Sequence, residues 1–230
     1  MAASQSRPRT ALLAGATGLI GAALLALLRD SADYGHTHLL LRRALPGPAT
    51  DAADARVTPH VVDFAQLSNP RPAPLPAVDD VFIALGTTIK VAGSQAAFRR
   101  VDFDLVVATA RAARAAGARR LAVVSALGAD PNSSVFYNRV KGEMQAAIVE
   151  LGYESVVIAQ PSLLIGDRSA LGQPTRAGEV WINRVLKPWR GLVPRGVRPI
   201  KASAVAAALL AATLAAQPGV RILGSGDMQQ

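Results

Sequence analysis

The stretch Leu12-Leu13-Ala14-Gly15-Ala16-Thr17-Gly18-Leu19-Ile20-Gly21 places three glycines where a short apolar strand passes directly into an apolar helix. At such a turn the first glycine adopts a backbone angle that other residues resist, and the second removes a side chain where a pyrophosphate must approach. The third lets the helix pack closely on the strand. Free N–H groups and the positive end of the helix dipole then face the phosphates. The stretch therefore predicts a dinucleotide site at residues 15–21.

The same stretch has a second interpretation, a signal peptide or a membrane anchor. Residues 11–28 carry no charge and follow Arg7 and Arg9, which is typical of such segments. Three glycines and one threonine interrupt the apolar surface, whereas a spanning helix needs a continuous one. The alanine-rich stretch 202–220 contains Gln217-Pro218-Gly219 near its end and is explained by burial against a sheet. We therefore expect no membrane segment.

Composition favours one soluble domain. The chain has 230 residues, half of them hydrophobic, which is enough to bury a sizeable core. It contains no cysteine, so disulfides and thiolate metal sites are excluded, and a reducing cytoplasm is the expected location. The formal net charge is +9, but the arginines form no long basic run and no nucleic-acid-binding motif accompanies them. We expect solvated basic faces and no nucleic-acid partner.

Apolar strand-like runs alternate with helical patterns, which is typical of a parallel sheet built from βαβ units. The expected strands are residues 11–14, 36–41, 57–62, 80–85, 120–124 and 155–159. The expected helices are residues 18–29, 95–116, 136–151, 179–186 and 202–216. We predict an α/β fold with a doubly wound parallel (Rossmann) sheet, in which residues 1–8 form a flexible tail and residues 9–230 form a single domain.

The second predicted strand ends in Leu41-Arg42-Arg43, where a dinucleotide site normally offers a carboxylate to the adenosine ribose. Guanidinium groups cannot accept hydrogen bonds from ribose hydroxyls, but they bind a 2′-phosphate through charge-assisted bonds. Arg42 and Arg43 therefore favour NADP over NAD, and two arginines that simply end a strand in solvent are the alternative. Asp63 is expected near the adenine, and Gly86-Thr87-Thr88 beside the pyrophosphate and the nicotinamide ribose.

A second set of candidate residues follows the fifth predicted strand. Tyr137 and Lys141 are four residues apart in a predicted helix and so share one face of it. A free tyrosine has a pKa of about 10, and a neighbouring ammonium favours its phenolate form. Ser125, at the end of the strand, would hydrogen-bond the oxygen whose charge changes during hydride transfer. The Tyr-x-x-x-Lys spacing is common on ordinary helices, so its position after a glycine turn is what indicates chemistry.

Histidine offers an incomplete set of metal ligands. His36 and His38 alternate along one predicted strand, and His60 lies on the next. Because no carboxylate stands nearby at ligand spacing, we predict no metal site.

In the order of these features, the chain resembles extended and atypical members of the short-chain dehydrogenase/reductase superfamily. Gly86-Thr87-Thr88, Val101-Asp102, Ser125 with Gly128-Ala129-Asp130, and Tyr137 with Val140-Lys141-Gly142-Glu143 are most similar to the oxidoreductase-like proteins first described as interactors of the viral Tat activator. Bacterial relatives are often labelled nucleoside-diphosphate-sugar epimerase-like. The resemblance implies a Rossmann core, bound NADPH, and a small substrate region at residues 161–200, with Pro161 leading past the nicotinamide.

The chain departs from the superfamily pattern in three respects. Leu127 stands where sugar-modifying members carry Ser or Thr, two places after the strand-end serine. Asp102 stands at the helix position where many relatives carry an asparagine that helps to hold an active-site water, and a carboxylate changes the local charge. The C-terminal part is also shorter than in true sugar-nucleotide epimerases, which weakens an epimerase assignment.

The resemblance implies that Tyr137 protonates a carbonyl oxygen, Ser125 orients that oxygen, and Lys141 also binds the nicotinamide ribose, while NADPH delivers hydride to the carbonyl carbon. The substrate is expected to be a small molecule. Basic residues between Arg168 and Arg198 leave an anionic substrate and a basic surface loop as open alternatives. An NADPH-binding regulatory or sensor protein with little or no catalysis is the alternative function, and the chain is expected to be a monomer or a homodimer.

Overall fold

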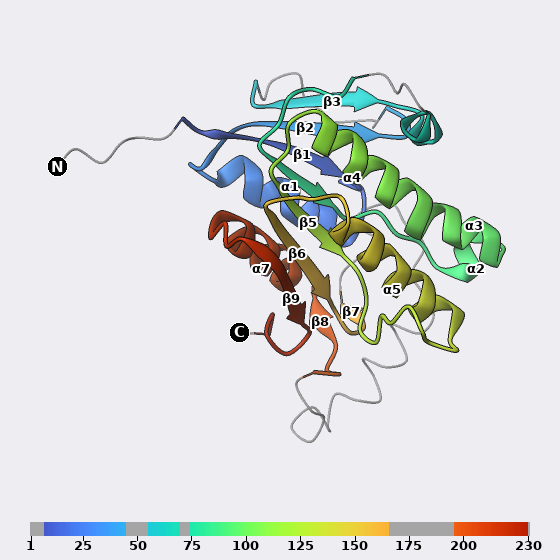
Figure 1. Ribbon diagram of the computed structural model, residues 1–230. Helices are drawn as coiled ribbons and strands as arrows, with labels where there is room; N and C mark the ends of the chain where they lie inside the picture. Colours follow the sequence, from blue (N-terminus) through green and yellow to red (C-terminus); the bar gives the residue numbers. More distant parts are fainter. Residues whose placement is uncertain (1–6, 45–54, 70–73, 166–195, 230) are drawn as a thin grey trace.

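The main sheet is parallel, and within the described residues it has seven strands in the order β3-β2-β1-β4-β5-β6-β9 (Figure 1). The computed structural model describes residues 7–44, 55–69, 74–165 and 196–229. The strands are β1 (Arg9–Ala14), β2 (Tyr34–Leu41), β3 (Val57–Val61), β4 (Asp80–Ile83), β5 (Arg120–Val124), β6 (Ser155–Gln160) and β9 (Gly219–Gly224). This arrangement confirms the predicted doubly wound α/β fold.

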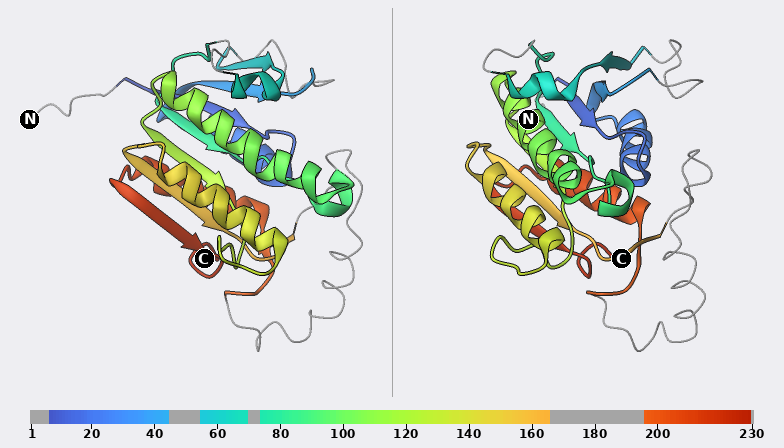
Figure 2. Two further views of the ribbon diagram at one scale, coloured as in Figure 1. Left: turned by 45° about the vertical axis from the view of Figure 1, so that its right-hand side comes forward. Right: turned by 90° about the vertical axis from the view of Figure 1, so that its right-hand side faces the viewer.

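Helices cover both faces of the sheet (Figure 2). The first face carries α1 (Leu19–Asp30) and α7 (Ala202–Leu214), and the second carries α4 (Leu105–Ala115) and α5 (Phe136–Val149). Successive strand residues point to opposite faces, so Leu13 packs in the core beneath α1 and α7, and Leu12 in the core beneath α4 and α5. Two apolar cores therefore fix the sheet between its helical layers.

The order of the strands reverses between β1 and β4. Moving outward from β1, the chain continues through β2 and β3 on one side, and through β4, β5 and β6 on the other. Ligands of open α/β sheets bind outside the carboxyl ends of the strands at such a reversal. The carboxyl edge around β1 and β4 is therefore where a site is expected.

A single helical run on the second face contains an irregular turn. It consists of α3 (Gln95–Arg99), the π-helical turn η3 (Arg100–Asp104) and α4. The helix predicted at residues 95–116 is confirmed, but the sequence pattern gave no sign of the wide turn. Shorter elements are the 3-10 helix η2 (Phe64–Ser68) after β3 and α2 (Ile89–Ala92) after β4.

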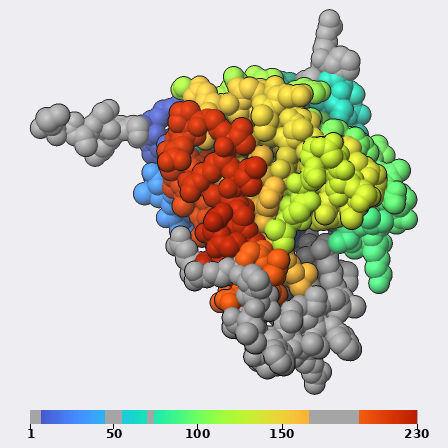
Figure 3. Space-filling view, turned by 60° about the horizontal axis from the view of Figure 1, so that its bottom comes forward, coloured from blue at the N-terminus to red at the C-terminus, as the bar shows by residue number. Residues whose placement is uncertain are grey.

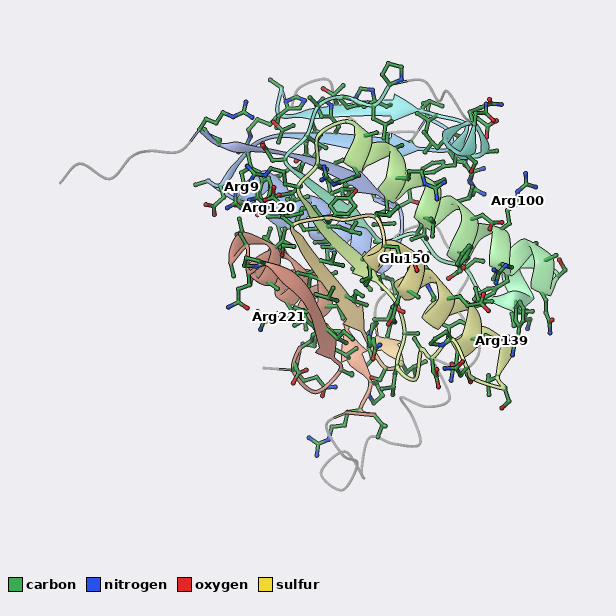
Figure 4. The ribbon with its side chains drawn as sticks, in the orientation of Figure 1. Arg9, Arg100, Arg120, Arg139, Glu150 and Arg221 are labelled. Atoms are coloured by element: carbon green, nitrogen blue, oxygen red, sulfur yellow. The ribbon has the colours of Figure 1, made fainter. Side chains whose placement is uncertain are left out.

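The amino edge of the sheet is held by a buried carboxylate. Asp80, fully buried at the start of β4, accepts a hydrogen bond from the Tyr34 hydroxyl at 2.6 Å. It also pairs with Arg120 and, at 3.5 Å, with Arg9. Figure 4 shows Arg9 and Arg120 together at this end of the sheet. The network ties the first residues of β1, β2, β4 and β5 to one another.

Several strands of the C-terminal part were not predicted. The edge strand β9 begins with four exposed residues and pairs in parallel with β6. Figure 3 shows the C-terminal residues, in red, at the surface of the molecule. The small parallel pair β7 (Leu164–Ile165) and β8 (Ile200–Lys201) was also missed. The predicted helix 179–186, most of the predicted substrate region 161–200, and residues 1–6 of the predicted tail lie outside the described residues.

In the parts of the chain that the structure describes, every helix is too short or too polar to cross a membrane.

Candidate functional site

The glycine turn is shaped by close approach of the backbone. Gly15 has a φ of +93°, and a Cβ on it would lie 2.6 Å from the backbone carbonyl of Ala84. A Cβ on Gly21 would lie 2.0 Å from the Gly15 carbonyl oxygen. Both positions therefore require glycine, the first for its backbone angle and its contact with the segment after β4, the second for packing of α1 on the turn.

The start of α1 carries backbone donors and no side-chain acceptor. Gly18 is the N-cap residue, and no side chain caps the helix. Ala16 and Ile20 are buried and Leu19 is half-buried, while Thr17 is exposed at the tip of the turn. The arrangement fits the diphosphate of a dinucleotide, because the first turn of α1 leaves main-chain N–H groups without a side-chain cap and a helix N-terminus favours negative charge.

The residues predicted to meet the adenosine half end β2 and β3. Arg42 and Arg43 follow β2 and are exposed. Asp63 follows β3, and its carboxylate caps η2 by accepting the Ala65 N–H at 3.0 Å and the Gln66 side-chain amide at 3.5 Å. Asp63 thus already has a structural role, and its contact with an adenine stays a prediction.

The loop after β4 contains Gly86, Thr87 and Thr88. Thr88 is the N-cap residue of α2, and its hydroxyl accepts the Val91 N–H at 3.2 Å. The Thr87 N–H donates to Asp102 Oδ2 at 2.8 Å. A Cβ on Gly86 would lie 3.3 Å from Asp102 Oδ1. The predicted Gly86-Thr87-Thr88 loop is therefore held against the π-helical turn by the Asp102 carboxylate.

Lys141 of α5 reaches the same carboxylate. Its Nζ lies 2.7 Å from Asp102 Oδ1, and the two side chains are only 4% and 1% exposed. Tyr137, one turn earlier on α5, is half-buried, with its ring centroid 5.3 Å from that of Phe98. The Lys141 ammonium, which was predicted to assist Tyr137, is thus engaged in a buried ion pair with Asp102.

A glycine contact fixes the start of α5. A Cβ on Gly142 would lie 2.2 Å from the backbone of Asp130 and Pro131, so the loop before α5 passes directly over this helix. The Asp130 N–H also donates to the Asn138 carbonyl oxygen at 3.1 Å. The loop is therefore packed and hydrogen-bonded against the first half of α5.

Ser125 is held by two residues that the sequence interpretation missed. The Gln145 side-chain amide donates to Ser125 Oγ at 2.5 Å, and Gln160 donates to Gln145 Oε1 at 3.2 Å. Because Ser125 Oγ accepts this hydrogen bond from Gln145, the Ser125 hydroxyl proton remains available for donation to another acceptor. The available signal was spacing, because Tyr137, Lys141 and Gln145 recur every four residues and share one helical face.

Pro161 follows β6 and is buried. Its carbonyl oxygen accepts the Leu127 N–H at 2.9 Å, which joins the segments after β5 and β6. The Ser225 hydroxyl donates to Ser162 Oγ at 2.8 Å. The basic residues predicted around the substrate, from Arg168 to Arg195, lie outside the described residues.

Comparison with protein families identifies the class of site. Residues 15–162 match the NAD(P)H-binding family, and this range contains the glycine turn, the Asp102–Lys141 pair and Ser125. The chain thus has an NAD(P)-binding domain, and the match does not distinguish NADP from NAD.

Curated relatives match over most of their length. "Protein FMP52, mitochondrial" of Coccidioides immitis (strain RS) is 32% identical over 235 residues, covering 95% of this chain and 94% of the relative. "Protein HTATIP2" of Rattus norvegicus is 35% identical over 176 residues, covering 76% of this chain and 69% of the relative.

The expected cytoplasmic location is wrong by comparison with these relatives, since FMP52 proteins from three fungi are named as mitochondrial. The expectation rested on the absence of cysteine, which indicates that no disulfide is needed but does not identify a compartment.

A solved structure shows the same fold over nearly the whole chain. It is an oxidoreductase of the short chain dehydrogenase/reductase family from Burkholderia thailandensis, with a TM-score of 0.68 and 20% identity, and the match covers 98% of this chain and 94% of that one. The chain therefore belongs to the NAD(P)H-binding family and is a homologue of HTATIP2, with a Rossmann fold shared by that solved oxidoreductase.

Proposed function

We propose that the protein is an NADP-dependent oxidoreductase that interconverts a small carbonyl compound and its alcohol. The observation that carries this proposal is the buried Lys141 ammonium beside the Gly86 loop. It lies on α5 four residues after Tyr137, at the same carboxyl edge as the glycine turn.

Tyr137, Ser125 and Lys141 have separate roles in the proposed reaction. Bound NADPH supplies the hydride that the carbonyl carbon receives. The Tyr137 hydroxyl gives its proton to the carbonyl oxygen, so that the C=O group gains one hydride and one proton. Ser125 donates a hydrogen bond to that oxygen, and its Gln145 contact leaves the proton free for this purpose. Lys141 retains donors for the hydroxyls of the nicotinamide ribose, because an ammonium has three N–H groups.

Arg42 and Arg43 support the choice of NADP over NAD. They are exposed at the carboxyl end of β2, which neighbours the glycine-turn strand β1. Guanidinium groups at this place bind a 2′-phosphate through paired, charge-assisted hydrogen bonds, whereas an unphosphorylated ribose offers hydroxyls that need an acceptor.

Calorimetric titration with NADPH and with NADH tests the cofactor assignment. The wild type is expected to bind NADPH more tightly, and the double variant Arg42→Ala, Arg43→Ala is expected to lose that preference. Arg100→Ala with Arg111→Ala is the matched control, since this double variant removes the same charge and both arginines are exposed, Arg100 in η3 (Figure 4) and Arg111 in α4. If neither nucleotide binds the wild type, the oxidoreductase proposal is wrong.

A screen of carbonyl compounds with NADPH tests the chemistry. Tyr137→Phe is expected to abolish turnover while NADPH still binds, because the ring is retained and only the proton donor is lost. Full turnover by this variant on a substrate that the wild type reduces would contradict the role of Tyr137.

An NADPH-responsive sensor is the second candidate, favoured by one observation. Asp102 pairs with the Lys141 ammonium, which opposes the use of that charge to activate Tyr137. NADPH binding without turnover of any carbonyl compound, accompanied by altered hydrogen exchange on the protein surface, would favour the sensor over the enzyme.

A further inference from the structure

Asp102 is a buried charged group of the site for which the proposed chemistry has no use. Its side chain is 1% exposed, and both of its oxygens are engaged, Oδ1 by Lys141 Nζ at 2.7 Å and Oδ2 by the Thr87 N–H at 2.8 Å. Burial of a carboxylate is unfavourable unless a cation and hydrogen bonds compensate it. The pair is therefore a specific contact between η3, α5 and the loop after β4.

The backbone around Asp102 departs from an ordinary helix. Asp102 lies in the π-helical turn η3, and such turns are rare insertions that often occur at functional sites. Asp102 is the buried residue of this turn, whereas Arg100 and Asp104 on either side are exposed. The turn thus carries the Asp102 carboxylate inward, while Arg100 and Asp104, two residues away on each side, stay exposed.

The pair lies beneath a backbone segment that has no side chain. A Cβ on Gly86 would lie 3.3 Å from Asp102 Oδ1 and 3.9 Å from Lys141 Nζ. Gly86 follows β4, the neighbour of β1 on the side away from β2. A dinucleotide with its diphosphate at the glycine turn and its adenosine over β2 extends its other half over β4 and β5, which places the ion pair next to the nicotinamide half.

Charge distinguishes the two redox states of that half. The oxidised nicotinamide ring carries one positive charge, and the reduced ring carries none. An unpaired ammonium nearby would repel the oxidised ring and so favour the reduced cofactor, whereas a carboxylate 2.7 Å from the ammonium cancels most of its field.

We propose that Asp102 is a positioning residue that holds Lys141 and neutralises it, so that the site binds NADP⁺ and NADPH with similar affinity. The inference rests on the proposed NADP-binding function. In this proposal Asp102 sets the ratio of the dissociation constants of NADP⁺ and NADPH, a role separate from the hydrogen bonds that bind the ribose.

Dissociation constants for NADP⁺ and NADPH, measured by calorimetry, test the proposal. Asp102→Asn keeps the size and the acceptor for Thr87 but removes the charge. It is expected to raise the ratio of the NADP⁺ to the NADPH dissociation constant about tenfold, from the repulsion of one uncompensated charge at an effective dielectric of about 20. The same shift makes the potential of the bound couple about 30 mV more positive.

Asp104→Asn is the matched control. It removes the same charge from the same turn, but the side chain is exposed, and the ratio is expected to stay at the wild-type value. The double variant Lys141→Met, Asp102→Asn carries neither charge, and its ratio is expected to return to the wild-type value, because a neutral pair replaces a neutralised one.

Equal weakening of both nucleotides by Asp102→Asn would mean that Asp102 only maintains structure, and would overturn the proposal. Should this variant fail to fold, the wild type alone decides, since NADPH binding more than about tenfold tighter than NADP⁺ contradicts a neutralised site. If the wild type binds neither nucleotide, the proposed function falls as well. If it binds both and the ratio does not move, this inference alone falls.

Discussion

Carboxylates are buried at both ends of the sheet, and they are compensated differently. At the amino edge, Asp80 meets two guanidinium groups and the Tyr34 hydroxyl, donated from β1, β2 and β5. At the carboxyl edge, Asp102 meets one ammonium and one backbone N–H, beneath a loop whose Gly86 has no side chain. Both carboxylates are almost wholly buried.

The difference separates a structural network from a site. Asp80 has more cationic donors than one carboxylate needs, and the groups around it come from strands that it holds in register. The Asp102–Lys141 pair balances one charge with one charge, and the ammonium keeps donors for a further partner. The several donors around Asp80 therefore suit a role in stabilising the fold. The single ion pair of Asp102 with Lys141, next to the backbone of Gly86, suits a contact with a ligand.

Removal of Asp80 should have the largest effect on stability. Asp80→Ala leaves Arg9 and Arg120 without their shared partner, and we expect the free energy of unfolding to fall by about 3–5 kcal/mol. Chemical denaturation measures this loss. Asp79→Ala is the control, because its ion-pair partner Arg7 is 84% exposed and its other contact is one hydrogen bond from the Thr10 N–H at 2.8 Å, so its loss should be about 1–2 kcal/mol. Equal losses in the two variants would contradict a structural role specific to Asp80.

Gly15→Ala should affect both NADPH binding and the stability of the fold, and its effect on binding should be the larger. Its φ of +93° and the 2.6 Å approach to the Ala84 backbone should lower the free energy of unfolding by about 1–3 kcal/mol, and the shifted turn should no longer bind NADPH in a calorimetric titration. Gly93→Ala is the matched control, since Gly93 has a φ of +86° with open space around it. NADPH binding by Gly15→Ala at the wild-type affinity would show that the turn does not form the cofactor site.

Tyr34 gives the amino edge an alkaline limit. Burial, followed by the Asp80 carboxylate, raises the pKa of Tyr34 well above its ordinary value of 10. The contribution to stability is therefore complete below about pH 10 and declines as the pH rises further. Tyr34→Phe should cost about 2 kcal/mol at pH 8 and flatten the decline above pH 10, as followed by denaturation at each pH.

Tyr153→Phe is the comparison for that measurement, because the Tyr153 hydroxyl donates to the neutral carbonyl oxygen of Ala110. The loss at pH 8 should be smaller than for Tyr34→Phe. An unchanged alkaline decline in Tyr34→Phe would rule out Tyr34 as its source.

The smallest effect on stability is expected from the histidines of β2 and β3, which are not among the groups described around Asp80 or Asp102. Burial, with His36 and His60 nearby, lowers the pKa of His38 to about 4. The neutral form is therefore favoured in the folded state, and stability should be lost as the pH falls from about 6.5 toward 4. His38→Gln should reduce this acid loss in denaturation experiments, and an identical acid loss would exclude His38 as a contributor.

Local features of the sequence were enough to predict the glycine turn and the strands from β1 to β6. Gly15, Gly18 and Gly21 follow one another within seven residues, and the buried strands are continuous apolar runs. β9 was missed because its apolar residues Val220, Ile222 and Leu223 form only a short run after the alanine-rich helix, and its partner β6 is remote in sequence. Glycine spacing and apolar runs do not indicate which distant elements of the chain contact each other.

The site was predicted as separate residues but not as a network. Lys141 and Asp102 were both identified from their motifs, yet their contact depends on a π-helical turn that has no compositional signature. The hydrogen bonds from Gln160 to Gln145 and from Gln145 to Ser125 likewise join β6, α5 and the segment after β5. Spacing within one helix predicts which residues share a face, whereas the partner of that face is decided by the packing of the sheet.

A crystal structure of the protein with NADP⁺ would show whether the carboxyl edge of β1 and β4 holds the dinucleotide. We expect the diphosphate on the N–H groups of residues 15–21, the 2′-phosphate beside Arg42 and Arg43, and the nicotinamide ribose beside Lys141. A dinucleotide bound elsewhere, or an unoccupied glycine turn at saturating NADP⁺, would contradict this expectation.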